Sequence, residues 1–205
     1  MRRATGNKAP QSSTGVSIQQ SLDGHSFSAE GLSGDFPGEG PVDVEVLTPR
    51  TLLLPAEDGD PDEKEAAELL AAAGMPAGTE ECVIRSGECE GCIAAMALNA
   101  EAVRTVREKL GDRARFTTPL LAGPRGDGKT VSCRRTAGLL YIKVYDGGLR
   151  FAEVLPVGTD EEALYFFGRL GEAFDLTDST LYLSGDGADR LRKAMKKRFK
   201  RIVCE

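Results

Sequence analysis

The sequence contains no tryptophan and only one histidine among its 205 residues. A Ser-His-Asp hydrolase is therefore excluded, because His25 would be the sole base and no G-x-S-x-G string occurs. No apolar run approaches the roughly 20 residues that a membrane-spanning helix needs. Arg2, Arg3 and Lys8 are not followed by an apolar stretch, which excludes a secretory signal. We expect residues 1–15 to be a disordered tail.

Cysteine is also too sparse for a recognisable metal site. Cys89 and Cys92 have the spacing of metal ligands, but tetrahedral zinc needs four donors, usually as two such pairs, and no second pair occurs. We expect a turn with incidental cysteines, and a metal or redox site is the alternative. Five cysteines without an export signal indicate free thiols in a reducing compartment, with the cytoplasm as the default.

Basic residues are outnumbered and the net charge is −6, which excludes a general nucleic-acid binder. One segment differs, because residues 190–201 hold eight Lys or Arg and no acid. Leu191, Met195 and Phe199 recur there every four residues, which predicts a helix with one apolar stripe packed on a sheet. The basic residues then form a solvated face, or alternatively a surface for an acidic partner or an anionic membrane.

The first half of the chain alternates short strands and helices. Residues 16–29 predict a hairpin, with Asp23-Gly24 as its two-residue turn. Residues 42–54 predict a strand or a bent pair, because Pro49 interrupts the apolar pattern. Further strands are expected at residues 82–85, 92–98 and 113–121, and helices at residues 62–73 and after the cap Asn99. This alternation is typical of an α/β layer plan.

The second half has a clearer order of elements. Three strands in a meander are expected at residues 130–135, 139–145 and 149–157, with Asp146-Gly147-Gly148 as the second turn. They are followed by a helix at 160–174, a strand at 180–183, the basic helix at 190–201 and a last strand at 201–204. The predicted order is β-β-β-α-β-α-β.

Several stretches resemble known bacterial proteins. TLYLSGDGA at residues 180–188 is an apolar strand running into a glycine turn that opens a helix, and it resembles the adenosine motif of actin-like ATPases, with Asp186 where a second glycine usually sits. Residues 145–158 resemble a hairpin of pilus-assembly and cell-division actin-like proteins. VSIQQSLDGHSFSA at residues 16–29, together with residues 139–162 and 180–185, resembles domain-of-unknown-function family 3822, a family of uncharacterised bacterial proteins.

The resemblance covers most of residues 16–205 and implies an α/β chain with an actin-like ATPase, or ribonuclease-H-like, fold. It implies two reduced lobes, each with a mixed sheet and flanking helices. We expect the first lobe at residues 16–122 and the second at residues 123–205.

A nucleotide site in such a fold needs a turn in each lobe, usually Asp-Gly, to hold phosphates and hydrated Mg²⁺. Asp23 and Gly24 supply this pair in the first lobe, although a tight hairpin explains them equally well. The corresponding turn of the second lobe, residues 134–138, has no carboxylate. Gly185 and Gly187 permit close approach of a base, but Asp186 adds a charged side chain between them. We therefore expect no bound cofactor, with ATP and Mg²⁺ as the alternative.

Residues 123–130 match the phosphate-loop pattern GxxxxGK[ST] in full. Gly123, Gly128, Lys129 and Thr130 would be its cofactor-binding residues. The pattern requires a strand before and a full helix after the loop. Residues 130–136 are β-branched at their start and reach Gly138 within eight residues, which favours a strand. We expect a chance match in a loop between the lobes.

These observations favour a non-enzymatic, actin-like scaffold that acts by binding another protein or itself. We expect no catalytic residue and no metal ligand. The alternative is a nucleotide-binding switch or NTPase that uses either the actin-like cleft or the phosphate-loop match.

Overall fold

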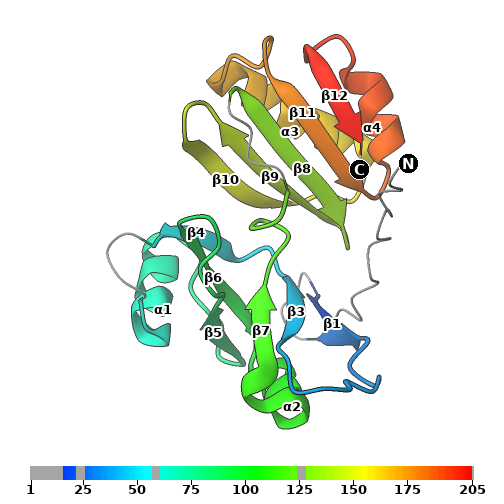
Figure 1. Ribbon diagram of the computed structural model, residues 1–205. Coiled ribbons are helices and arrows are strands. Elements are labelled where there is room, and N and C mark those ends of the chain that lie inside the picture. Colours follow the sequence, from blue (N-terminus) through cyan, green and yellow to red (C-terminus); the bar gives the residue numbers. More distant parts are fainter. Residues whose placement is uncertain (1–15, 22–25, 57–60, 124–127, 205) are drawn as a thin grey trace, which may run out of the picture.

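The computed structural model describes residues 16–21, 26–56, 61–123 and 128–204. The predicted tail at 1–15 and the predicted Asp23-Gly24 turn lie outside these residues. The described elements form two lobes (Figure 1). We call the five-stranded sheet with α3 and α4 the C-terminal lobe, and the two smaller sheets with α1 and α2 the N-terminal lobe.

The C-terminal lobe contains strands β8 (Thr130–Thr136), β9 (Leu139–Tyr145), β10 (Leu149–Pro156), β11 (Thr180–Gly185) and β12 (Arg201–Cys204). Their order in the sheet is β10-β9-β8-β11-β12. The meander β8-β9-β10 is antiparallel, while β11 runs parallel to both β8 and β12. Helices α3 (Asp160–Ala173) and α4 (Ala188–Met195) pack on one face of the sheet (Figure 1). The predicted β-β-β-α-β-α-β order is confirmed.

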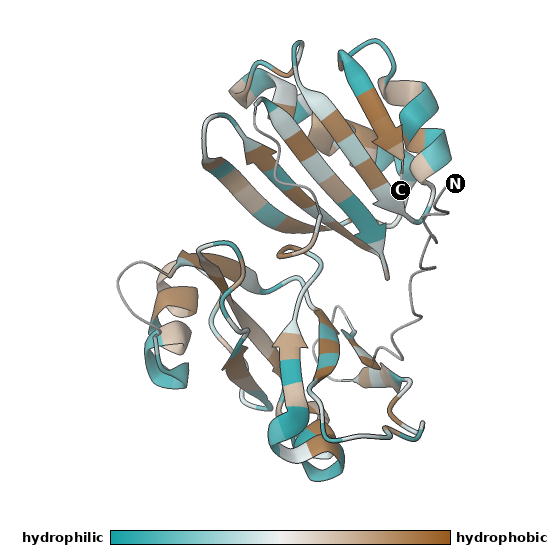
Figure 2. Cartoon of the chain, viewed as in Figure 1, coloured by the Kyte–Doolittle hydropathy of each residue, from teal (hydrophilic) through white to brown (hydrophobic). Residues whose placement is uncertain are grey.

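Alternation along the strands builds the core of this lobe. Figure 2 shows hydrophobic bands recurring along β8 and β11, as expected where every second side chain points to one face. That face holds Val131, Leu140, Leu181 and Leu183, which pack against helix residues such as Phe167. Helix α3 begins with a capping box. The Thr159 hydroxyl accepts a hydrogen bond from the Glu162 amide, and the Glu162 carboxylate accepts one from the Thr159 amide.

The basic helix is shorter than predicted. Helix α4 ends at Met195, and the Arg198 amide closes a turn by donating to the Met195 carbonyl at 2.9 Å. Like charges four residues apart, as at Arg192 and Lys196, oppose continuation of a helix. Phe199 is nevertheless buried in the same core, with its ring edge-on to Phe167. The apolar stripe therefore packs as predicted although its last residue lies outside the helix.

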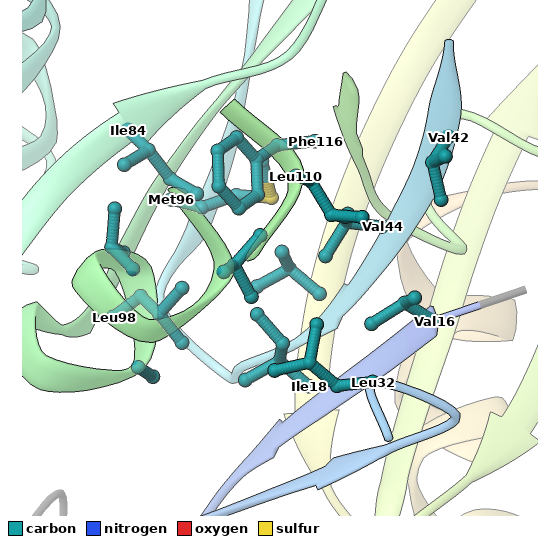
Figure 3. Close-up of a cluster of buried hydrophobic side chains, with 14 of the residues drawn as sticks. Val16, Ile18, Leu32, Val42, Val44, Ile84, Met96, Leu98, Leu110 and Phe116 are labelled. Carbon is teal, nitrogen blue, oxygen red and sulfur yellow. The ribbon is translucent and has the colours of Figure 1, made fainter. Parts of the chain in front are cut away.

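The larger sheet of the N-terminal lobe contains β1 (Val16–Gln20), β2 (Phe27–Glu30), β3 (Val42–Leu47) and β7 (Ala114–Thr117), in the order β2-β1-β3-β7. Strands β1 and β2 pair antiparallel, as the hairpin prediction requires, and β1 pairs parallel with β3. Helix α2 (Ala100–Leu110) covers this sheet and begins at the predicted cap Asn99. Figure 3 shows Ile18, Val44 and Leu110 in the resulting cluster.

A second sheet of this lobe contains β4 (Thr51–Pro55), β5 (Glu81–Arg85) and β6 (Cys92–Asn99), in the order β4-β6-β5, with α1 (Glu63–Ala72) packed on it. Residues 42–54 are thus a bent pair, whose halves β3 and β4 belong to different sheets. The bend is held by Thr48, whose hydroxyl donates to the Ala97 carbonyl at 2.9 Å, and Pro49 has no amide to continue a strand.

The strand predicted at residues 113–121 is shorter in the structure. A 3-10 turn, Gly111–Arg113, precedes β7, and β7 ends at Thr117. The Leu121 amide then donates to the Thr118 carbonyl at 3.0 Å. Pro119 cannot donate to a strand ladder, which explains the turn.

The two lobes meet at a small apolar cluster. Leu47 and Leu120 of the N-terminal lobe contact Leu139, Tyr141 and Val154 of the five-stranded sheet in the C-terminal lobe. The predicted boundary between residues 122 and 123 falls in the connection from β7 to β8 and stays a prediction. Among the described residues, no helix combines the length and the apolar character needed to cross a membrane.

Candidate functional site

The glycine turn at residues 184–188 lies where β11 ends and α4 begins. Gly185 pairs with Arg135 at the end of the parallel strand β8, and the Asp186 amide donates to the Arg135 carbonyl at 2.7 Å. Gly187 caps α4 in the left-handed conformation. The carboxyl ends of two parallel strands and the start of a helix therefore meet here, which is where open α/β sheets bind ligands.

Both glycines are explained by contacts inside the chain. A Cβ atom on Gly185, which has φ of +80°, would lie 2.0 Å from the Arg135 carbonyl oxygen. A Cβ atom on Gly187, which has φ of +70°, would lie 2.9 Å from a guanidinium nitrogen of Arg190. The backbone of β8 thus fills the space beside Gly185, and glycine is required there whether or not a ligand binds. At Gly187 the left-handed backbone itself favours glycine, since the Arg190 side chain can move.

An arginine–aspartate cluster of Arg135, Asp160 and Arg190 lies under this turn. Asp160 accepts from Arg135 Nη1 at 2.5 Å and from Arg190 Nε at 2.6 Å. The residue Arg135 is buried, with 7% of its surface exposed, and also donates to the Gly158 carbonyl at 3.0 Å. Hydrogen bonds from Arg190 and then from Arg135 hold the pKa of Asp160 below its usual range. The carboxylate therefore stays ionised between two guanidinium groups.

We expect acid to weaken the arginine–aspartate cluster. The folded pKa of Asp160 is lowered, so its contribution to stability is complete above the ordinary aspartate pKa of about 3.9 and is lost as pH falls through the folded value. Circular dichroism should show that Asp160→Asn reduces the loss of stability below about pH 4. Asp178→Asn, which changes an exposed aspartate, should leave the profile unaltered. An Asp160→Asn profile as steep as that of the unchanged chain would contradict this assignment.

Another arginine, Arg134, forms an ion pair between the two lobes beside the same turn. Arg134 of β8 forms a two-pronged ion pair with Glu45 of β3, with Nη1–Oε1 at 2.7 Å and Nη2–Oε2 at 3.0 Å. The side chains of Arg134 and Glu45 are 35% and 28% exposed. A planar guanidinium bound to both carboxylate oxygens fixes the orientation of each partner. Arg134 and Arg135 thus both have carboxylate partners from this chain.

The remaining residues predicted for the cleft are not brought together by the described structure. Asp23 and Gly24 lie outside the described residues. The turn between β8 and β9 contains Ala137 and Gly138, both with positive φ, and has no carboxylate. Asp146 lies in the turn between β9 and β10, at the opposite end of the meander from the glycine turn.

The phosphate-loop match does not lead into a helix. Thr130 is the first residue of β8, is 3% exposed and pairs with Tyr145 and Thr180 on the neighbouring strands. Lys129 Nζ lies 3.5 Å from the Asp175 carboxylate. Gly123 packs against Ser132, and Gly128 precedes the strand. A phosphate loop points its amides at the ligand from a helix start, and residues 128–136 do not supply that geometry.

A pocket of about 210 Å³ lies between the five-stranded sheet and the connection from β7 to β8. Its volume is below the about 300–1,000 Å³ of small-molecule sites, so it does not accommodate a nucleoside triphosphate. Burial raises the pKa of the Tyr141 phenol in its wall. Lys143, also in the wall, donates to the Ala122 carbonyl at 2.8 Å.

The basic segment at residues 190–201 forms an exposed surface beside β12, and Figure 2 shows α4 largely hydrophilic. Arg190 is paired with Asp160, and Arg192 Nη2 lies 3.6 Å from Asp189 Oδ1. The other basic side chains of the segment are exposed: Lys193, Lys196, Lys197, Arg198, Lys200 and Arg201. The charge predicted for this segment is therefore available at the surface.

The ion-pair partners of Arg134 and Arg135, and the role of Arg190 as a second donor to Asp160, were not predicted from the sequence. Asp160 reads as an acid in the first turn of a helix, Glu45 as a polar position in a strand, and Arg190 as one of several basic residues. Arg134 and Arg135 were the available signal, because two adjacent arginines near the core of a domain require acidic partners.

Comparison with known proteins supports the fold. No protein-family model matches the chain, and no curated protein sequence matches it. A solved structure from Bacteroides thetaiotaomicron VPI-5482, described as a protein with an actin-like ATPase fold and unknown function, matches with a TM-score of 0.68 and 17% identity, covering 93% of this chain and 90% of that one. The chain therefore has an actin-like ATPase fold. Its resemblance to family 3822 stays a prediction.

Two other solved structures match more weakly. The cytoplasmic domain of EpsL, an inner membrane component of the type II secretion system of Vibrio cholerae, has a TM-score of 0.39 and 9% identity, covering 83% of this chain and 81% of that one. A PilM–PilN type IV pilus biogenesis complex also has a TM-score of 0.39, with 16% identity, covering 92% of this chain and 87% of that one. At these scores neither match adds to the assignment of the fold.

Proposed function

We propose that this chain is a non-catalytic actin-like scaffold, with a degenerate nucleotide site, that acts by binding another protein or a second copy of itself. The arginine–aspartate cluster under the glycine turn is the observation that carries the proposal. Asp160 accepts hydrogen bonds from both Arg135 and Arg190 at the place where the resemblance puts an adenosine site. A nucleotide would have to displace these charge-assisted bonds, which are among the stronger hydrogen bonds in proteins, and one of their donors, Arg135, is buried.

The charges beside the cluster support the same proposal. A phosphate-binding turn of this fold needs a carboxylate to orient hydrated Mg²⁺. Arg134 and Arg135 lie at the end of β8, directly before the corresponding turn of the C-terminal lobe, and Arg134 is held by Glu45 of the other lobe. A guanidinium at this position attracts phosphate but cannot bind the cation.

Binding to a partner of acidic character follows from the basic surface at residues 190–201. Six exposed cationic side chains lie there without an acid among them, in a chain whose net charge is −6. Such a local field increases the rate of encounter with an acidic protein surface. We place the protein in the cytoplasm as part of the same proposal, because its five cysteines are free thiols.

The phosphate-loop match at residues 123–130 keeps a nucleotide-binding switch as the second candidate. Its glycines, Lys129 and Thr130 have the required spacing in the sequence. Under this alternative the nucleotide binds either there or at Asp23, Gly24, Gly185 and Gly187.

Calorimetric titration with Mg-ATP and with Mg-GTP tests the proposal. We expect no saturable heat at nucleotide concentrations up to about 1 mM, since a weaker Kd corresponds to less than about 4 kcal/mol of binding free energy. Binding with a micromolar Kd would contradict the scaffold proposal. Lys129→Ala would then locate the site, because only a phosphate loop would lose affinity, and Lys109→Ala on the exposed face of α2 serves as the matched control.

A further inference from the structure

Two cysteines face each other across a tight hairpin turn. The Cys89 amide donates to the Cys92 carbonyl at 2.8 Å, and the Cys92 amide donates to the Cys89 carbonyl at 3.0 Å. Between them, Glu90 and Gly91 have φ values of +52° and +77°, which are typical of a type I′ turn. The cysteines that the sequence suggests are incidental are therefore directly opposed, as an isolated bridge at the start of β6.

An opposed pair of this kind has a Cα separation within the range of disulfides. Residues that exchange both backbone hydrogen bonds have Cα atoms about 5.5 Å apart, and disulfides span Cα separations of about 4.4–6.8 Å. Their side chains lie on the same face of the hairpin. Cys89 and Cys92 both line a cavity of about 20 Å³, which has room for about one water.

This hairpin lies at the contact between the two lobes. Its small cavity is also lined by Leu121, in the connection from β7 to β8, and by Tyr145 and Leu149 of the five-stranded sheet. The Ala56 amide, at the end of β4, donates to the Gly91 carbonyl at 2.9 Å and holds the turn in place. Cys89 is exposed and Cys92 is partly exposed, so a small oxidant can reach the pair.

We propose that Cys89 and Cys92 form a reversible disulfide, which makes this hairpin a redox-responsive site at the contact between the lobes. The oxidant is a low-molecular-weight disulfide. One cysteine thiolate attacks a sulfur of the oxidant, forms a mixed disulfide and releases one small thiol; the other thiolate then attacks the protein sulfur and releases the second. The pair loses two electrons and two protons, and the oxidant is reduced to two thiols.

The surroundings favour this reaction over metal binding and over reaction at the core cysteines. No group of three or more His, Cys, Asp or Glu side chains within the described ranges could hold a metal ion. Burial raises the pKa of the Cys133 thiol to about 12, and burial also raises the pKa of Cys82. A thiol with a raised pKa supplies little of the reactive thiolate.

The test treats the full chain with mixtures of oxidised and reduced glutathione, followed by acid quenching, alkylation, trypsin digestion and mass spectrometry. Residues 86–104 form one tryptic peptide that holds Cys89, Cys92 and no other cysteine. We expect this peptide to escape alkylation and to be lighter by two hydrogen atoms. Its oxidised fraction should exceed that of Cys82 at least about tenfold, because the second thiol is held at high effective concentration.

Single substitutions separate an internal disulfide from other products. Cys89→Ser should leave a glutathione adduct at Cys92, and Cys92→Ser should leave one at Cys89. Cys204→Ser, which removes another exposed thiol, should leave the internal disulfide unchanged. Glutathione adducts without an internal bond, disulfide-linked dimers, or zinc bound in stoichiometric amount by the reduced chain would each overturn the proposal.

Discussion

Gly185→Ala is expected to destabilise the folded chain by about 3–5 kcal/mol, the sum of a backbone clash and a left-handed residue. The added Cβ atom would lie 2.0 Å from the Arg135 carbonyl oxygen, a distance that backbone cannot accommodate without movement of β8 or β11. That oxygen also accepts the Asp186 amide, so movement would break the bond that closes the turn.

Gly74→Ala is the matched control for this substitution. Gly74 has φ of +82°, almost the value at Gly185, but no atom lies within 4 Å of the position that an added Cβ atom would take. Alanine there should cost only the conformational term, about 1–2 kcal/mol. Urea denaturation, monitored by circular dichroism, measures the free energy of unfolding of both variants. Equal costs at the two glycines would show that the close approach of Arg135 does not hold in solution.

Glu81→Ala is expected to cost about 3–5 kcal/mol, as is typical when one partner of a buried ion pair is removed. The Glu81 side chain is 3% exposed and accepts hydrogen bonds from Arg50, from the Gln20 amide group and from the Gly78 amide at 2.6 Å. Its loss would leave the Arg50 guanidinium and the buried Gln20 side chain without this acceptor. These residues connect the two sheets of the N-terminal lobe.

An exposed ion pair supplies the comparison. Glu63 of α1 pairs with Arg107 of α2 at 2.8 Å, and about half of each side chain is exposed. Glu63→Ala should cost less than about 1 kcal/mol, because water screens and replaces such a pair. Thermal unfolding of both variants gives the difference. If Glu81→Ala were as mild as Glu63→Ala, the buried network would contribute no more than a surface contact.

Local signals in the sequence predicted most elements of the fold. The cap at Asn99, the turn at 146–148 and the strand signal at residues 139–145 each act within a few residues, and the structure contains all three elements. The division of residues 42–54 between two sheets depends on Thr48 bonding to Ala97, far along the chain. No local pattern contains that information, although the bent pair itself was among the predictions, and the predicted strand boundary was wrong at residues 118–121.

The candidate site shows the same distinction. Gly185 and Gly187 were identified from their pattern, but the reason for Gly185 became clear only from the backbone of Arg135. Arg134 was recognised as a departure from an acidic turn, whereas its partner Glu45 lies 89 residues away in the sequence. Pairing between distant charges depends on the completed fold, so sequence periodicity does not reveal it.

The Glu45–Arg134 pair has a consequence for how the lobes respond to their solvent. It links β3 to β8 and is about one-third exposed, so dissolved ions can reach it. Electrostatic screening acts over about 8 Å at physiological ionic strength. Concentrated salt should therefore weaken this link between the lobes and dilute salt should strengthen it, which makes ionic strength a physical control on how firmly the lobes are held together.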